Sequence, residues 1–176
     1  LLCAACAISA PVDLVAAGSA LERGFNRVYT WHFLRSLRRK GAEMLRRFPG
    51  LLQAEALARA RTLRAFDDCV TAPLHGFADA LDYWMRASSK PWLRHIRLPT
   101  LVLNARDDPF LPEQALPTAS DVSAYVTLEQ PRHGGHGAFV SGRFPGSLEW
   151  LPKRVARFVS AALARSPAQA PAERMA

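Results

Sequence analysis

The chain has 176 residues, enough to bury one ordinary hydrophobic core, and its three cysteines do not make the even disulfide framework of small secreted domains. Its formal net charge of +8 comes mainly from arginine, which can attract anionic lipid or nucleic acid. No aromatic-interleaved recognition motif or zinc finger accompanies the arginines, so we expect no nucleic-acid partner and at most a weak contact with an anionic membrane surface.

The first ten residues are mostly apolar, too few for a membrane-spanning helix, and predict a buried strand. Cys3 and Cys6 form a Cys-x-x-Cys inside this strand, without the second pair or the spaced histidines of a zinc site. We therefore predict no metal and no cofactor. Buried thiols in a reducing cytoplasm are the expected state of the cysteines.

Helical periodicity follows in residues 14–63. Apolar residues recur every three or four positions between Phe25 and Leu37, with arginines on the opposite side, and Pro49-Gly50 breaks the pattern. Residues 64–77 contain proline, glycine and paired acids, which favours an ordered loop over a helix. Helical spacing resumes in residues 78–87.

Two strands and a closing helix are predicted in the rest of the chain. Residues 98–104 and 122–128 are rich in β-forming residues, and residues 148–163 form an amphipathic helix pattern. The Pro/Ala-rich tail, residues 165–176, is predicted to be disordered. This order of strands and helices is typical of an α/β fold with a parallel sheet. Three strands are few for such a sheet, so we expect further strands before Leu1.

Two acids and a histidine follow the two later strands. Asp107 and Asp108 come just after residues 98–104, and His136 lies after residues 122–128 in a loop of three glycines. Groups that follow parallel strands meet at the carboxyl edge of the sheet. A hydrolytic serine needs a base to take its proton and a carboxylate to orient that base, and acid before histidine is the chain order of α/β-hydrolase triads. The pattern therefore predicts the acid and base of a hydrolase.

Several short sequence motifs along the chain are distinctive enough to indicate a protein family. They are Ser9-Ala10-Pro11-Val12-Asp13-Leu14, residues 21–29, Phe66-Asp67-Asp68, residues 71–77, Asp82-Tyr83-Trp84 through Ser88-Ser89, Pro99-Thr100-Leu101, Asp107-Asp108-Pro109-Phe110 and residues 134–139. With these motifs, nearly everything from Ala4 to Phe158 resembles the C-terminal part of the YheT-like α/β-hydrolases, a family of predicted carboxylesterases.

The resemblance implies a division of the chain. Residues 1–13 would hold the core strand that follows the nucleophile helix, and residues 14–63 a helical cap inserted over the site. Residues 64–164 would be the C-terminal α/β-hydrolase core with the acid and histidine loops, before the tail at 165–176. Phe66-Asp67-Asp68 would pin the cap or shape the pocket, without chemistry of its own. The cap carries four aromatic residues that either line an acyl pocket or pack together: Phe25, Tyr29, Trp31 and Phe33.

The resemblance also implies roles for the site residues. His136 would be the general base, and one of the pair Asp107 and Asp108 the supporting acid. Asp108 is favoured because the acid of the wider superfamily commonly stands directly before a proline at this turn, and Asp107 remains the alternative. His133, in the same loop, is interpreted as a non-catalytic neighbour.

The nucleophile does not follow the family pattern. Members carry Gly-x-Ser-x-Gly at a strand-to-helix elbow, and no such pentapeptide occurs here. Ser19 and Ser141 each lack the second glycine and the elbow context. The chain is therefore expected to be a fragment without its serine and oxyanion-hole donors, inactive by itself.

The predicted function is that of a serine hydrolase fragment whose parent cleaves carboxylic, acyl or lipid-like, esters of small-molecule substrates. One alternative is acyl transfer to an alcohol, since an acyl-enzyme can be resolved by a nucleophile other than water. Another is a non-catalytic basic domain that binds anionic membrane or nucleic acid through its arginines. The sequence does not indicate an oligomeric state.

Overall fold

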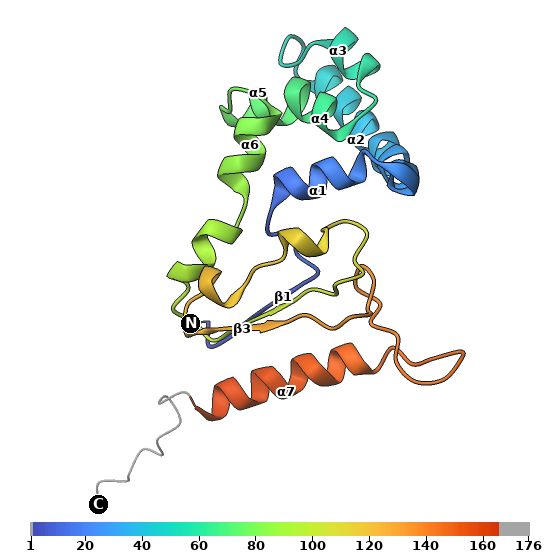
Figure 1. The fold of residues 1–176 in the computed structure, drawn as a ribbon. Coiled ribbons are helices and arrows are strands. Elements are labelled where there is room, and N and C mark those ends of the chain that lie inside the picture. The colour runs from blue at the N-terminus through green and yellow to red at the C-terminus, as the bar shows by residue number, and fades with distance from the viewer. Residues whose placement is uncertain (1, 166–176) are drawn as a thin grey trace, which may run out of the picture. The chain divides into compact units, whose positions relative to one another are not determined.

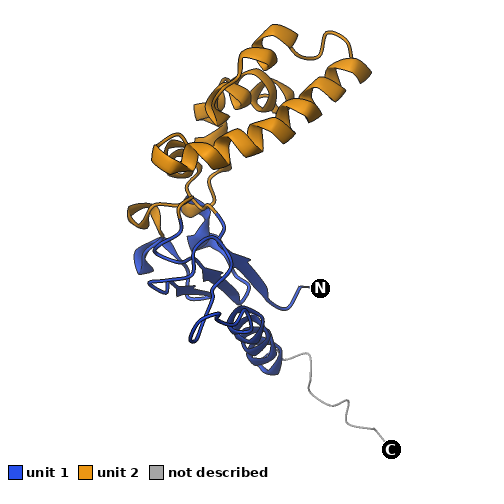
Figure 2. Cartoon of the chain, turned by 90° about the vertical axis from the view of Figure 1, so that its right-hand side faces the viewer, with its two compact units in different colours: residues 1–10, 91–108, 117–176 blue, residues 11–90, 109–116 orange. Residues whose placement is uncertain are grey.

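The structure is a computed structural model that describes residues 2–165 (Figure 1). All but the first residue of the predicted disordered tail lie outside the described residues. The chain forms two compact units (Figure 2). Unit 1 consists of residues 1–10, 91–108 and 117–176, and unit 2 of residues 11–90 and 109–116. The predicted boundary between a cap and a core at residue 63 stays a prediction.

Unit 1 is built on a parallel sheet of three strands in the order β1-β2-β3. The strands are β1 (Ala5–Ile8), β2 (Thr100–Leu103) and β3 (Val126–Glu129). All four residues of the central strand are buried, as expected for an apolar strand covered on both faces. The predicted α/β class with a parallel sheet is confirmed.

Helix α7 (Trp150–Ala164) runs along one face of this sheet (Figure 1). Its Trp150, Leu151 and Phe158 pack against a buried cluster made of Leu101, Leu103, Ala105 and Phe139. This cluster lies at the point where β2 passes into residues 104–108, the acid loop, which carries Asp107 and Asp108. The packing of α7 therefore also supports the residues that follow the strand.

The third strand starts four residues later than the sequence pattern predicts. Residues Ala119–Asp121 form a 3₁₀ turn, η5, which a capping box stabilises: the side chains of Thr118 and Asp121 each bond the other's backbone N–H. Val126 then donates its N–H to Ser123, so the chain turns once more before it joins the sheet. The strand predicted from Val122 and Tyr125 therefore begins only at Val126, because local polar residues hold the preceding segment in turns.

Unit 2 is helical. Its helices are α1 (Leu14–Leu21), η1 (Gly24–Asn26), α2 (Arg27–Arg47), α3 (Ala54–Arg59), α4 (Leu63–Phe66), η2 (Asp67–Thr71), α5 (Ala72–His75) and α6 (Ala80–Ala87). Asp13 caps α1 by accepting from the N–H of Ala16 at 2.9 Å. One buried cluster in the core of unit 2 comprises Leu34, Leu52, Leu57, Ala60, Phe66 and Val70. Of the two remaining 3₁₀ turns, η4 (Glu113–Ala115) lies in unit 2, and η3 (Lys90–His95) lies in unit 1 except for its first residue.

The loop predicted for residues 64–77 is wrong, because this segment is helical throughout α4, the π-helical turn η2 and α5. Phe66 and Val70 turn into the core of unit 2, and that burial outweighs the loop-forming composition. Pro73 stands in the first turn of α5. Gly76 then ends α5 with a φ of +72°.

The paired acids of this segment bond other parts of unit 2. Asp67 accepts from the indole N–H of Trp84 at 2.8 Å and from the hydroxyl of Thr71 at 2.5 Å. Asp68 accepts from the backbone N–H of Ala80 at 2.7 Å, at the start of α6. The two carboxylates therefore join η2 to α6.

The thiols are free, but not all are buried as expected. Cys6 and Cys69 are half-buried, which raises the pKa of both thiols, whereas Cys3 is exposed at the chain's start. Within residues 2–165, no helix combines the length and the hydropathy needed to cross a membrane.

Candidate active site

Asn104 joins the carboxyl ends of the three strands of unit 1. It directly follows β2, its side chain is completely buried, and its backbone N–H donates to the carbonyl of Glu129 in β3 at 3.1 Å. Its Nδ2 donates to the carbonyl of Ala10 at 3.0 Å, just past β1. Asn104 was not predicted as a site residue, although an amide at the end of an apolar run was the available signal in the sequence.

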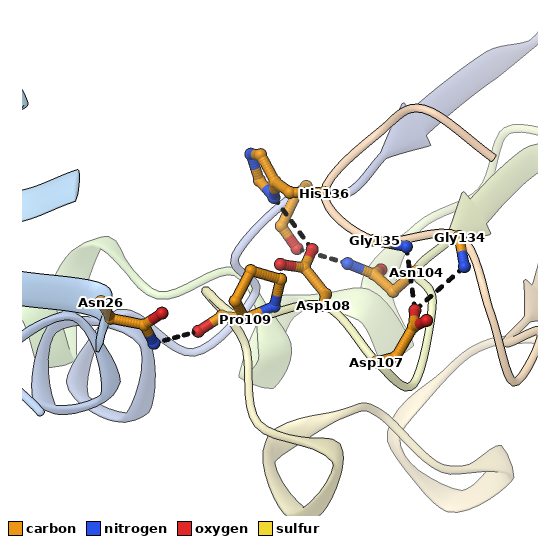
Figure 3. Close-up of polar contacts among 9 residues, drawn as sticks. Asn26, Asn104, Asp107, Asp108, Pro109, Gly134, Gly135 and His136 are labelled. Carbon is orange, nitrogen blue, oxygen red and sulfur yellow. Dashed lines mark hydrogen bonds and ion pairs between the residues drawn. The ribbon is translucent and has the colours of Figure 1, made fainter. Parts of the chain in front are cut away.

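Asp108 and His136 form a pair at this edge of the sheet (Figure 3). The Oδ2 atom of Asp108 lies 2.9 Å from Nδ1 of His136. The Asp108 side chain has no exposed surface, while 39% of the His136 side chain is exposed. A buried carboxylate at Nδ1 fixes the imidazole's orientation and places the other ring nitrogen, Nε2, in the position of a proton acceptor.

Asp107 has different partners. Its Oδ1 accepts from the backbone N–H groups of Gly134 and Gly135, both at 2.9 Å (Figure 3). Its Oδ2 lies 3.3 Å from Nδ1 of His133. The N–H of Gly135, together with His133 and Gly134, holds the pKa of Asp107 below its ordinary value, against a smaller opposing effect of burial. The two neighbouring acids thus bond different targets, one a loop backbone and the other an imidazole.

Residues 130–139, which follow β3 and carry His136, form the histidine loop. Its glycines are required for two different reasons. A Cβ atom at Gly134 would lie 2.5 Å from Cδ1 of Phe139 and 2.9 Å from the Cβ of Ala105, so only glycine fits there. Gly137 has a φ of +103°, which side chains rarely permit. The N–H of Phe139 donates to the carbonyl of Gly134 at 3.0 Å and closes the loop around His136.

Residues 109–116, directly after Asp108, belong to unit 2. The carbonyl of Pro109 accepts from Nδ2 of Asn26 at 2.6 Å (Figure 3), and the ring of Phe110 contacts those of Tyr29 and Phe33, with centroid distances of 4.9 and 5.8 Å. Asn26 holds the backbone that follows the acid from 83 residues away in sequence. No local sequence signal marks Asn26 as a residue that contacts this backbone.

Of the four aromatics singled out in the sequence, Phe25, Tyr29 and Phe33 take part in ring contacts with one another or with Phe110. Trp31 is 64% exposed and lines a cleft of about 730 Å³ in unit 2. Its neighbours in that cleft include apolar side chains and arginines: Val28, Leu34, Ala60, Arg27, Arg35, Arg38 and Arg61.

Neither serine considered in the sequence stands at a strand-to-helix elbow. Ser19 lies within α1, and Ser141 forms a β-bridge with Ser147, to whose carbonyl its hydroxyl donates at 3.3 Å. Among residues 2–165 no group of three or more His, Cys, Asp or Glu side chains is arranged to hold a metal ion.

Several known proteins are similar to this chain over most of its length. It is 38% identical over 154 residues to the protein named "Putative esterase YheT" of Escherichia coli, covering 86% of this chain and 45% of that protein. It is 31% identical over 160 residues to an abhydrolase domain-containing protein of Dictyostelium discoideum, covering 87% and 39%. It is 28% identical over 162 residues to the phospholipase ABHD3 of Mus musculus, covering 91% and 39%. The chain spans less than half the length of each of these relatives.

No model of a known protein family matches the chain. No solved structure matches it either.

Proposed function

We propose that this chain, which belongs to the YheT-like family of α/β-hydrolases, carries the acid and the general base of a serine hydrolase. The observation that supports this most is the buried Asp108 carboxylate at 2.9 Å from Nδ1 of His136. Both residues follow the carboxyl ends of adjacent parallel strands, where α/β proteins place their reacting groups.

In the proposed reaction, Nε2 of His136 takes the proton of a serine hydroxyl as that oxygen attacks the ester carbonyl. Asp108 keeps the second proton on Nδ1 and stabilises the imidazolium that forms, without itself being protonated. His136 then gives its proton to the departing alcohol, and in the second half of the cycle it activates the water that releases the acid. His136 and Asp108 are thus the catalytic residues that this chain contributes.

The serine and the oxyanion-hole donors would come from residues outside this sequence. The chain contains no Gly-x-Ser-x-Gly, and its relatives are more than twice as long as the part it matches. We therefore propose that the chain is the C-terminal part of a longer enzyme and does not turn over esters alone. An in-frame Gly-x-Ser-x-Gly encoded upstream of Leu1 is the expected finding, and a complete gene without one contradicts the proposal.

The proposed substrate is a carboxylic ester with a lipid-like acyl group. The names of the relatives, an esterase and a phospholipase, support this choice. Water is the proposed acceptor of the acyl group, and product analysis in added ethanol distinguishes hydrolysis from acyl transfer, because a transferase would yield the ethyl ester. The cytoplasmic location, inferred from the cysteines alone, stays a prediction.

The direct test is ester turnover by the full-length protein. We expect His136→Ala to lower kcat for p-nitrophenyl esters by about 10³-fold or more, as the loss of a triad base does. The matched control is His133→Ala, which changes a histidine of the same loop whose side chain is 86% exposed. Activity of His136→Ala within a few-fold of wild type would exclude it as the base.

A further inference from the structure

Contacts between the acid loop and the histidine loop continue the pairing of β2 with β3 past the end of the sheet. The last paired residues are Leu103 and Glu129. Beyond them, Arg106 donates its backbone N–H to the carbonyl of Pro131 at 2.9 Å and its Nε to that of Gln130 at 3.2 Å. Each later residue of the acid loop therefore meets a later residue of the histidine loop.

Asp107 is the next member of this series. One carboxylate oxygen accepts two consecutive backbone N–H groups, those of Gly134 and Gly135. Asp108 follows and meets His136, so the residue that binds the loop backbone stands directly before the one that binds the imidazole. Glycine loses more backbone freedom on ordering than any other residue, so a loop rich in glycine needs such an anchor to hold one conformation.

We propose that Asp107 is a positioning residue for His136. Its carboxylate fixes the backbone at Gly134 and Gly135, and this fixed backbone keeps the imidazole of His136 against Asp108. The catalytic part of this inference rests on the proposed function, whereas the ordering of the loop does not. Paired acids at this turn would then have separate tasks, one of holding the loop and one of orienting the base.

An asparagine at position 107 separates this role from that of a triad acid. The amide oxygen of Asn can occupy the place of Oδ1 and accept the same two N–H groups, so it should retain the anchor. A neutral amide cannot stabilise an imidazolium, and replacing a triad Asp by Asn costs about 10⁴-fold in kcat. The two roles therefore predict opposite results for one substitution.

The kinetic experiment compares Asp107→Ala, Asp107→Asn and Asp108→Asn in the full-length protein. We expect Asp107→Ala to lower kcat by about 10- to 100-fold with KM nearly unchanged, because an error of 1 Å in placing a reacting group costs up to about 10²-fold. Asp107→Asn should recover most of that loss, and Asp108→Asn should lose about 10⁴-fold. A loss in Asp107→Asn as large as in Asp108→Asn, or full activity of Asp107→Ala, overturns the proposal.

A second readout does not depend on turnover. Amide hydrogen exchange at Gly134 and Gly135 should accelerate by about tenfold or more in Asp107→Ala and remain slow in Asp107→Asn, because the bonds concerned are charge-assisted in wild type and retained with the amide. His133→Ala is the matched control, since it removes the contact to Asp107 without touching these N–H groups.

Amide hydrogen exchange at Val102, in the buried strand β2, should have the same rate in all variants. An equal rate there shows that the fold is intact. Equal exchange at both glycines in wild type and Asp107→Ala overturns the proposed anchor. If wild type cleaves no ester, the proposed function fails, and the exchange data still decide whether Asp107 orders the loop.

Discussion

Replacing Gly134 by alanine tests whether the histidine loop must hold one position. The new Cβ would lie 2.5 and 2.7 Å from Cδ1 and Cε1 of Phe139, and 2.9 Å from the Cβ of Ala105. Carbon atoms in good contact are about 3.5–4.0 Å apart, so the loop or the ring must move by about 1 Å. Phe139 is 3% exposed and stacks on Trp150 with ring centroids 5.5 Å apart, which leaves the ring little room to move.

We therefore expect Gly134→Ala to lower the free energy of unfolding by about 1–3 kcal/mol, the usual cost of overpacking. The displaced loop carries His136 two residues later, so kcat for ester hydrolysis by the full-length protein should fall by about 10- to 100-fold. Urea denaturation measures the first quantity and steady-state kinetics the second.

The control is Gly76→Ala, at the end of α5. Its φ is +72° and nothing lies within 4 Å of an added Cβ, so alanine there costs about 1–2 kcal/mol of backbone strain without a clash. The two variants should lose similar stability, and only Gly134→Ala should lose kcat. If Gly134→Ala keeps full kcat, or if Gly76→Ala loses as much, the displaced loop is not the cause.

Three further predictions concern single contacts. Trp84→Phe removes the indole N–H that Asp67 accepts at 2.8 Å, and should lower the free energy of unfolding in urea by about 1–3 kcal/mol; unchanged stability would show that the bond contributes nothing. Asn26→Ala leaves the carbonyl of Pro109 without its donor and should cost about 1 kcal/mol by the same measurement, a result that equal denaturation midpoints would contradict. The pKa of Asp107 is lower in the folded protein than in the unfolded chain, so its ionised form stabilises the fold fully above the unfolded pKa of about 3.9. The difference in free energy of unfolding between wild type and Asp107→Asn should therefore shrink as the pH falls below that value. A difference that stays constant with pH would refute this effect.

The sequence was sufficient for the parts of the fold that rest on apolar runs and chain order. The run that became β2 is apolar and fully buried, and acids followed by a histidine after successive strands predicted which loops would meet. It was insufficient where burial opposed local composition. In residues 64–77 the proline, glycine and acids read as a loop, yet the burial of Phe66 and Val70 makes the segment helical.

The division between Asp107 and Asp108 could not be predicted from residue types, because two identical side chains stand next to each other. Only the path of the turn decides which carboxylate points inward, and the structure buries Asp108 while Asp107 remains 42% exposed. The hydrogen bond from Asn26 to Pro109 joins residues 83 positions apart, and no local sequence pattern predicts a contact over such a sequence separation.

Labelling with a fluorophosphonate probe tests the central claim most directly, because the probe reacts covalently with a serine activated by a histidine base. The full-length wild-type protein should be labelled at one serine outside residues 1–176, and His136→Ala should react at least about 100-fold more slowly. Equal labelling of wild type and His136→Ala would contradict the assignment of His136 as the general base.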